Sequence, residues 1–437
     1  MQHIALLSQE LAKKLNIPEE LIKRYLISRL DRIIKYAKFF ILEDEYIERE
    51  WKEMVSLHYI NTTYQFKPFV ARIHFFKDKV IESDFYLGFA NIRPIGEVSA
   101  SLSFIYPNWK MLAHEFRRTY GEDVYVMTYK KTVHICGKEL IIHTFPFFSQ
   151  DGVVTICAHA AIAMVTKFVR RTLEYNLIKL SDIVGGYSFK TKMISSEGIT
   201  IYHMIEIFNN AKIPISSIHF NKYKEYFREW ADSYIESKLP IILTSNDHVI
   251  TVIGHTLGID NRRKYLVYDD SGAFFQQKDL DGDTRKGKSF VDLVNWEAIE
   301  DYIKPNGYMI VPEMEKVFIP FPNMKKNYVR FVKSVFLKEG YEVKSERFLI
   351  VDNSILKNFL MNPKKKTLSD KDKSRFEEMV KSNLPHYLWF CEVVLSKNGR
   401  EMMVGIIADP TRHLQSSSSM FYNFRIRLDR SISLLTI

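Results

Sequence analysis

The apolar periodicity of residues 149–312 changes part-way, and this change constrains the fold more than any other feature of the chain. The first part carries apolar residues at helical spacing, and the second part carries short apolar or alternating runs. The helical runs are 155–176, 199–210 and 222–237, and the strand-like runs are 239–245, 248–255 and 264–270. Helices followed by tightly connected strands predict an α+β unit with an antiparallel sheet.

The two flanking regions show different patterns. The first 58 residues read as helical, with Asn16 and Glu19 as a capping-box-like helix start, and short strand-like runs follow up to Phe148. Residues 313–437 contain mixed elements and a strand pair around the turn SKNGR. A chain of 437 residues exceeds the usual single-domain size. We therefore expect an N-terminal α/β-rich domain (1–148), a central domain (149–312) and a C-terminal α+β domain (313–437).

Cysteine usage and hydropathy set the expected compartment. The chain has three cysteines, Cys136, Cys157 and Cys391, which is too sparse and uneven a set for a disulfide framework. No apolar run approaches the ~20 residues that cross a bilayer, and the N-terminus lacks the pattern of a signal peptide. These features predict a cytoplasmic protein with no membrane partner, with export by a signal-free route as the alternative.

The formal net charge of +10 raises the possibility of a nucleic-acid partner. The basic clusters are short and scattered, however, and they form no long stripe on one predicted helix; they are 262–264, 325–326 and 364–366. This distribution favours a solvated surface, so nucleic acid is not the expected partner.

Cys157 begins a helical run rich in small residues, after the apolar run VVTI. A thiol at a helix N-terminus lies where the helix dipole and free N–H groups favour the thiolate. The small residues would let the helix pack closely against a sheet; they are Ala158, Ala160, Ala161 and Ala163. Taken alone, the pattern also fits a buried cysteine at the start of a core helix.

Three further polar positions complete a possible thiol site. His248 opens an apolar strand-like run, and Asp269 and Asp270 end the next one, so either carboxylate could orient the imidazole. The sequence Asp-Asp-Ser-Gly is also typical of turns, so the two carboxylates could simply belong to a turn. Gln150 precedes Cys157 and could join the Cys157 backbone N–H in an oxyanion hole, although a surface glutamine would look the same.

The order of these residues resembles the papain-like cysteine peptidases, in particular the bacteriocin-processing peptidase-like branch and its relatives, which include phytochelatin synthases. The matching stretches are QDGVVTICAHAAIAMV, LPIILTSNDHVITVIG and YLVYDDSG, within residues 149–275. The resemblance implies a papain-like central domain with the nucleophile on a helix N-terminus and the His and Asp on an antiparallel sheet.

The same resemblance assigns roles to individual residues. It implies Cys157 as nucleophile, His248 as base, Asp269 as orienting acid with Asp270 as the alternative, and Gln150 in the oxyanion hole. The chain departs from the family pattern in three places: the Gln-to-Cys spacing is one residue longer, Ala158 stands where a glycine is usual, and the loop between His248 and Asp269 is longer.

This arrangement predicts a cysteine hydrolase, a peptidase that acts on a peptide or protein through a thioester acyl-enzyme. An acyltransferase or transamidase with the same triad and a non-catalytic protein-binding module are the alternatives. We expect no cofactor and no metal, because no Cys/His cluster has zinc spacing. Residues 282–289 match the phosphate-loop pattern literally, but no apolar strand precedes them, which favours a charged surface loop.

Overall fold

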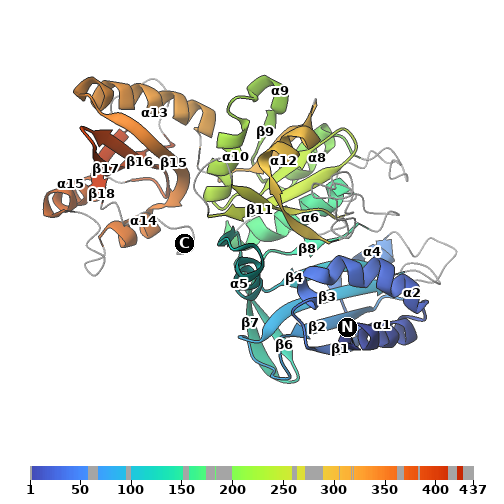
Figure 1. Ribbon diagram of the computed structural model, residues 1–437. Coiled ribbons are helices and arrows are strands. Elements are labelled where there is room, and N and C mark those ends of the chain that lie inside the picture. Colours follow the sequence, from blue (N-terminus) through green and yellow to red (C-terminus); the bar gives the residue numbers. More distant parts are fainter. Residues whose placement is uncertain are drawn as a thin grey trace. The chain divides into compact units, whose positions relative to one another are not determined.

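The computed structural model describes most of the chain, and it divides into two compact units. The described residues are 2–57, 67–94, 100–150, 157–173, 183, 199–257, 263–270, 289–304, 306–315, 317, 319–361, 369–381, 384–411 and 421–426. The first unit comprises 1–222 and 240–312, and the second comprises 223–239 and 313–437 (Figure 1). Both units combine helices with antiparallel sheets, so the expected α+β class is confirmed.

Residues 223–239 belong to the second unit, whereas the sequence-based division assigns them to the central domain. The three-domain division itself stays a prediction. The phosphate-loop pattern at 282–289 lies outside the described residues except for Ser289.

A five-stranded antiparallel sheet with the order β1-β2-β3-β4-β8 forms the N-terminal part of the first unit. Its strands are β1 (Phe39–Tyr46), β2 (Val70–Phe76), β3 (Tyr86–Pro94), β4 (Ala100–Pro107) and β8 (Phe147–Phe148). The helical segments before and after β1 are α1 (Gln2–Leu15), α2 (Glu19–Leu21), η1 (Ile22–Ile27), η2 (Ser28–Leu30), α3 (Asp31–Ile34) and α4 (Arg49–Leu57). Strands β2 and β3 are buried along most of their length.

Three local expectations for this region are wrong. Asn16 does not cap a helix: it has a φ of 55° after the end of α1, and Pro18 is the N-cap of α2, without a side-chain cap. Strand β1 interrupts the helical region, and helix α5 (Trp109–Tyr120) interrupts the strand-like one. Helix α5 ends at Gly121, whose φ of 72° is the left-handed conformation that glycine adopts readily.

A seven-stranded antiparallel sheet forms the rest of the first unit. Six strands follow the order β13-β12-β11-β10-β14-β9, and β5 pairs with β11. The strands are β5 (Val124–Val126), β9 (Ile215–His219), β10 (Ile241–Thr244), β11 (Val249–Thr256), β12 (Lys264–Tyr268), β13 (Val291–Asn295) and β14 (Tyr308–Pro312). Helices α6 (Cys157–Thr172), α8 (Ile201–Asn210), α9 (Phe220–Tyr223) and α12 (Trp296–Ile303) accompany this sheet, and β6 (Tyr129–Ile135) and β7 (Lys138–Thr144) form a separate hairpin.

Helix α6 packs against β11 and β8. Its alanines are almost completely buried, as their small size predicts for a helix that approaches a sheet closely. All eight residues of β11 are buried as well. At Gly254 a Cβ would lie 2.1 Å from the Tyr125 carbonyl oxygen, so only glycine at this position allows β5 to pair with β11.

The second unit contains a four-stranded antiparallel sheet in the order β15-β16-β17-β18. Its strands are β15 (Glu342–Asp352), β16 (Tyr387–Lys397), β17 (Arg400–Ala408) and β18 (Phe421–Ile426). Its helices are α10 (Phe227–Glu236), α13 (Phe321–Val335), η5 (Leu337–Glu339), α14 (Asn353–Leu360) and α15 (Asp370–Lys381). The predicted strand pair is confirmed: Asn398 and Gly399, both with positive φ, make the turn between β16 and β17.

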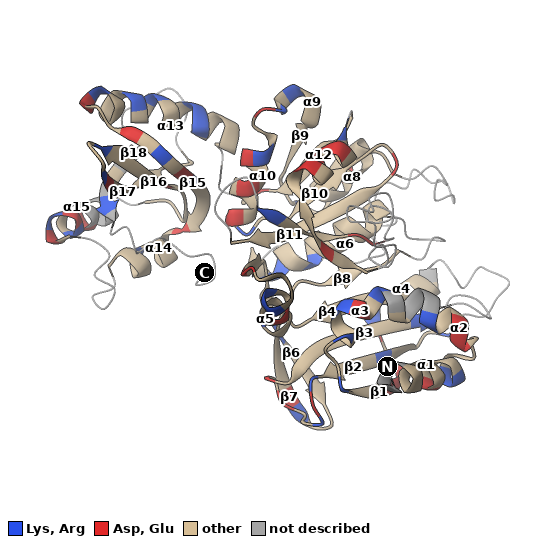
Figure 2. Cartoon of the chain, in the orientation of Figure 1, with Lys and Arg blue, Asp and Glu red and all other residues tan. Residues whose placement is uncertain are grey.

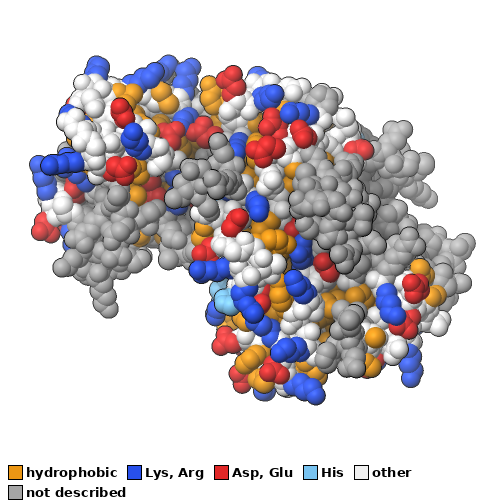
Figure 3. Space-filling view, viewed as in Figure 1, with side chains coloured by type: hydrophobic (Ala, Val, Ile, Leu, Met, Phe, Trp, Pro, Cys, Tyr) orange, Lys and Arg blue, Asp and Glu red, His pale blue; other side chains and the backbone are white. Residues whose placement is uncertain are grey.

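Charged residues of both signs occur in each unit (Figure 2), and on α13 the basic residues Lys326, Arg330 and Lys333 share one helix face. The charged residues of α6 and α13 are all basic, and the face shown in Figure 3 has both signs intermixed. None of the described helices combines the length and the apolar character that crossing a membrane requires.

Candidate active site

Cys157 is the first residue of α6, and its side chain is partly exposed. The N-terminus of a helix carries backbone N–H groups without helical partners and the positive end of the dipole, both of which favour a negative group. The other cysteines lie in different surroundings. Cys136 is exposed, and Cys391 is buried, which raises the pKa of its thiol.

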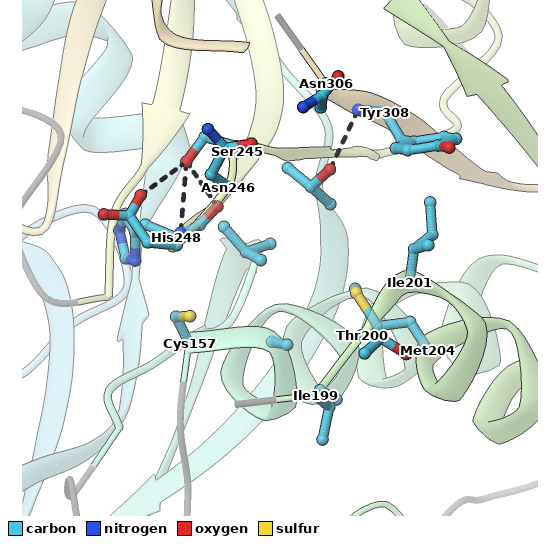
Figure 4. Close-up of a pocket in the computed structure, with 14 residues that line it drawn as sticks. Cys157, Ile199, Thr200, Ile201, Met204, Ser245, Asn246, His248, Asn306 and Tyr308 are labelled. Atoms are coloured by element: carbon cyan, nitrogen blue, oxygen red, sulfur yellow. Dashed lines mark hydrogen bonds between the residues drawn. The ribbon is translucent and has the colours of Figure 1, made fainter. Parts of the chain in front are cut away.

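His248 lies at the end of the tight loop that joins β10 to β11. The loop is closed by hydrogen bonds from the Ser245 N–H to the His248 carbonyl (2.9 Å) and from the His248 N–H to Ser245 Oγ (3.3 Å). Figure 4 shows the loop above the start of α6, with Cys157 and His248 lining one pocket. The loop therefore fixes the backbone that carries the imidazole.

Asp269 follows β12 directly and accepts a hydrogen bond from His248 Nε2 at 2.8 Å. The pairing of Thr251 with Tyr268 brings the start of β11 beside the end of β12, which places the two side chains next to each other. The Asp269 side chain is fully buried and that of His248 is 10% exposed. The contact is therefore shielded from solvent.

The surroundings of His248 favour its protonated form. Burial alone would lower its pKa. Hydrogen bonds with the Asp269 carboxylate and the Cys157 side chain, and the negative charges of Asp269 and Asp270, outweigh burial and raise the pKa to about 10. A histidine that keeps its proton at neutral pH is suited to stand beside a thiolate.

Asp270 is buried next to this pair but is engaged less closely. Its Oδ1 lies 3.8 Å from His248 Nε2, and no described side chain donates a hydrogen bond to its carboxylate. Burial raises the pKa of Asp270 to about 7; repulsion from Asp269 adds to the rise, and attraction to His248 and Arg29 opposes it. The distances favour Asp269 over Asp270 as the partner of His248.

Arg29, from the N-terminal helical segment, holds the end of β12. Its Nη2 donates to the carbonyl oxygens of Asp269 (3.1 Å) and Asp270. Ser149 Oγ donates to the Asp270 carbonyl (3.3 Å), and the Asp269 N–H donates to the Phe290 carbonyl (3.2 Å). These contacts fix the backbone on which both carboxylates stand.

The pocket beside Cys157 has a volume of about 240 Å³. The start of α6, the segment before α8 and the loop that carries His248 contribute to its walls (Figure 4). Its lining is partly apolar, with Ile199, Ile201, Met204 and Val249, and partly polar, with Ser245, Asn246 and Asn306. This mixture suits a short stretch of an organic substrate with hydrogen-bonding groups.

Gln150 is the predicted residue that the structure does not bring into contact with the others. It is half-buried, its carbonyl accepts hydrogen bonds from Ser101 and Ser149, and it is absent from the described lining of the pocket. Residues 151–156, which connect it to Cys157, lie outside the described residues. Its oxyanion-hole role stays a prediction.

His248, Asp269 and Asp270 also form a group that could hold a metal ion. Each offers one ligand atom, and these atoms lie within 4.8 Å of one another. His248 Nε2 lies 2.8 Å from Asp269 Oδ1 and 3.8 Å from Asp270 Oδ1, so a cation bound through this nitrogen would replace the His248–Asp269 hydrogen bond. The expectation of no metal stays a prediction.

Sequence reasoning missed three residues around this site. Nothing in the sequence marks Arg29 as part of the site, because arginine is common in helical runs. The Tyr302 ring lies edge-on to His248 with centroids 6.4 Å apart, but in sequence it only marks the apolar face of α12. Ser245 could have been found, because Ser-Asn-Asp between two apolar runs is turn chemistry with capping hydroxyl and carboxyl groups.

Comparisons with known proteins add little to this geometry. No protein-family model matches the chain, and no curated protein matches it. Among solved structures the chain is similar to UfSP from C. elegans, with 17% identity and a TM-score of 0.26. The match covers 46% of this chain and 37% of that protein, so the chain spans well under half of its length. A likeness at this level says nothing about activity.

Proposed function

We propose that the chain is a cysteine hydrolase with a papain-like central domain, a peptidase in which Cys157 is the nucleophile, His248 the base and Asp269 the orienting acid. The observation that carries the proposal is the position of His248. Its side chain interacts with Cys157 at a helix start and with the fully buried Asp269, and both interactions raise its pKa.

The proposed mechanism uses the two ring nitrogens of His248 separately. Nε2 donates to Asp269, which leaves Nδ1 as the nitrogen that exchanges a proton with the thiol. The Cys157 thiolate attacks the substrate carbonyl, and His248 then protonates the leaving amine, so that a thioester remains. Water donates a proton to His248 and its hydroxyl to the acyl carbon, and the bond from that carbon to sulfur breaks, which releases the carboxylic acid and restores the Cys157 thiolate beside a protonated His248.

The first test is the rate at which a haloacetamide alkylates Cys157, measured by mass spectrometry of the full chain. We expect Cys157 to react faster than Cys391, which is buried, and also faster than the exposed Cys136. His248→Ala should slow the alkylation of Cys157 by about 10²-fold or more, in line with the usual contribution of a positioned base. Cys136 in the same sample serves as the internal control.

Equal labelling of Cys157 and Cys136 in the native protein, or an unchanged rate in His248→Ala, would contradict the proposal and leave a non-catalytic module. An activity that releases product only when an amine or thiol acceptor is added would replace hydrolysis with acyl transfer.

A further inference from the structure

A second pocket, of about 290 Å³, lies at the other end of α6 and is separate from the Cys157 site. Its walls come from the end of β1, the start of α4 and the segment between them, from β2, β3, β4 and β6, and from the last turns of α6. Charged side chains dominate the lining, together with the rings of Tyr46, Phe89 and Tyr106. We call it the cationic pocket.

Positive charge exceeds negative charge in this lining, with six basic and three acidic side chains. Two pairs neutralise each other: Lys167 binds Glu50, and Arg49 binds Glu53 at 3.0 Å. The basic groups that remain are Arg72, Lys131, Arg170 and Arg171; among the described residues, none of the four lies within salt-bridge distance of a carboxylate.

Glu48, the third acidic residue, adds little negative charge to the cationic pocket. It is 4% exposed, and its carboxyl accepts hydrogen bonds from Asn91 (2.6 Å) and Ser103 (2.5 Å). Burial raises its pKa, and repulsion from Glu50 contributes. The carboxyl is therefore occupied within the fold and is not available to neutralise the basic groups.

Arg72 is held in a fixed position. Its guanidinium lies 3.2 Å from the centroid of the Tyr46 ring and 4.4 Å from that of Phe89, and its Nε donates to Asn91 at 2.8 Å. An arginine that contacts two aromatic rings and an amide oxygen has already lost much of its rotamer freedom, so binding an anion costs it little additional entropy.

Lys131 shows that the basic groups repel one another. Burial and the charges of Lys167, Arg72 and Arg171 lower its pKa to about 8. A bound anion would relieve this repulsion.

We propose that the cationic pocket binds a small, multiply charged anion that carries phosphate groups. Phosphate oxygens match the planar guanidinium donors and can face several cations at once, whereas a single carboxylate brings one charge. The volume is near the lower end of the range for small-molecule sites, which fits a compact ligand. The proposal is independent of the reaction at Cys157.

The test is calorimetric titration of the full chain with inorganic pyrophosphate at low ionic strength. Lys131→Met and Arg171→Gln should each weaken binding by about 10-fold or more, the usual loss for one charge-assisted hydrogen bond. Lys130→Met is the matched control: it removes the same charge from the neighbouring position on β6, which is exposed and points to the other face of the strand, and it should change affinity less than about 2-fold.

Arg171 is exposed, so Arg171→Gln keeps the proposal testable even if Lys131→Met disturbs folding. Absence of pyrophosphate binding to the native chain would overturn the proposal. Equal weakening of pyrophosphate binding by Lys131→Met and Lys130→Met would show that the affinity depends only on the overall positive charge of this region. That result would also overturn the proposal. Citrate binding more tightly than pyrophosphate would refute the phosphate assignment.

Discussion

The two ends of α6 place charged groups in contrasting surroundings. At its start, Cys157 interacts with His248, and His248 in turn donates a single hydrogen bond, shielded from water, to the buried Asp269. At its end, Arg170 and Arg171 enter a pocket in which basic groups outnumber acidic ones.

The start of α6 is therefore suited to a chemical reaction, and its end is suited to binding an ion. A few matched charges in a dry site strongly alter one another's proton affinity, which is useful for moving protons. An excess of one charge in a more open site alters proton affinity less but attracts ions of the opposite sign. We therefore expect substitutions at the first end to change chemistry and stability more than substitutions at the second.

The largest effect should come from replacing the two adjacent aspartates, Asp269 and Asp270, by asparagine one at a time. Asp269→Asn should reduce kcat/KM for peptide hydrolysis by about 10²–10⁴-fold, because the amide no longer supports the imidazolium. Asp270→Asn should reduce it less than about 10-fold, since Asp270 lies 3.8 Å from Nε2. Steady-state kinetics on both variants decides between them, and the reverse order would make Asp270 the orienting acid.

Asp270→Asn should also stabilise the fold at alkaline pH. The folded pKa of Asp270, about 7, lies above its usual 3.8, so its contribution to stability is fully present below about pH 3.8 and is lost as pH rises through 7. The variant should gain up to about 4 kcal/mol at pH 8.5 and nothing at pH 4, as read from urea unfolding. If the variant and the native protein differed in stability by the same amount at pH 8.5 and at pH 4, the charge of Asp270 would be compensated within the folded protein.

Arg29→Met should reduce the reactivity of the Cys157 site indirectly, through the backbone that carries Asp269 and Asp270. Loss of the bonds to two carbonyl oxygens should destabilise the fold by about 2–3 kcal/mol and slow alkylation of Cys157. Lys35→Met removes an exposed cation from the end of the same helical segment and is the control, with an expected change below about 0.5 kcal/mol. If both variants behave alike in thermal unfolding and labelling, Arg29 has no positioning role.

The smallest effect is expected at the second end of α6. The lowered pKa of Lys131 means that its charge opposes folding at neutral pH, and partial solvent screening reduces that cost. Lys131→Met should therefore stabilise the protein by about 1 kcal/mol at pH 7 in urea unfolding, whereas Lys130→Met should not. A loss of stability in Lys131→Met would show that its charge is already compensated.

Local signals made part of the site predictable from sequence. A thiol that begins a helix, a histidine that opens a strand and a carboxylate that ends the next strand are all short-range patterns. Antiparallel pairing of neighbouring strands then brings His248 and Asp269 together, because the start of β11 lies beside the end of β12.

Long-range contacts could not be predicted in this way. Arg29 reaches Asp269 across 240 positions, and no periodicity reports such a contact. The cationic pocket draws residues from seven helices and strands (β1, α4, β2, β3, β4, β6 and α6), so its charge is spread over short, separate stretches of the sequence. Helix α5 was missed although Trp109, Leu112 and Phe116 have helical spacing, because strand-like runs flank it on both sides.

The Arg29 contact also has a consequence for biosynthesis. At about 5–20 residues per second, the ribosome makes Asp269 roughly 10–50 s after Arg29. The N-terminal helical segment must therefore wait for its partner while about half of the chain is synthesised, and the proposed thiol site cannot be completed before Asp269 has been made. A nascent chain released before residue 269 would lack both Asp269 and the backbone that Arg29 holds in place, and so could not carry out the proposed reaction.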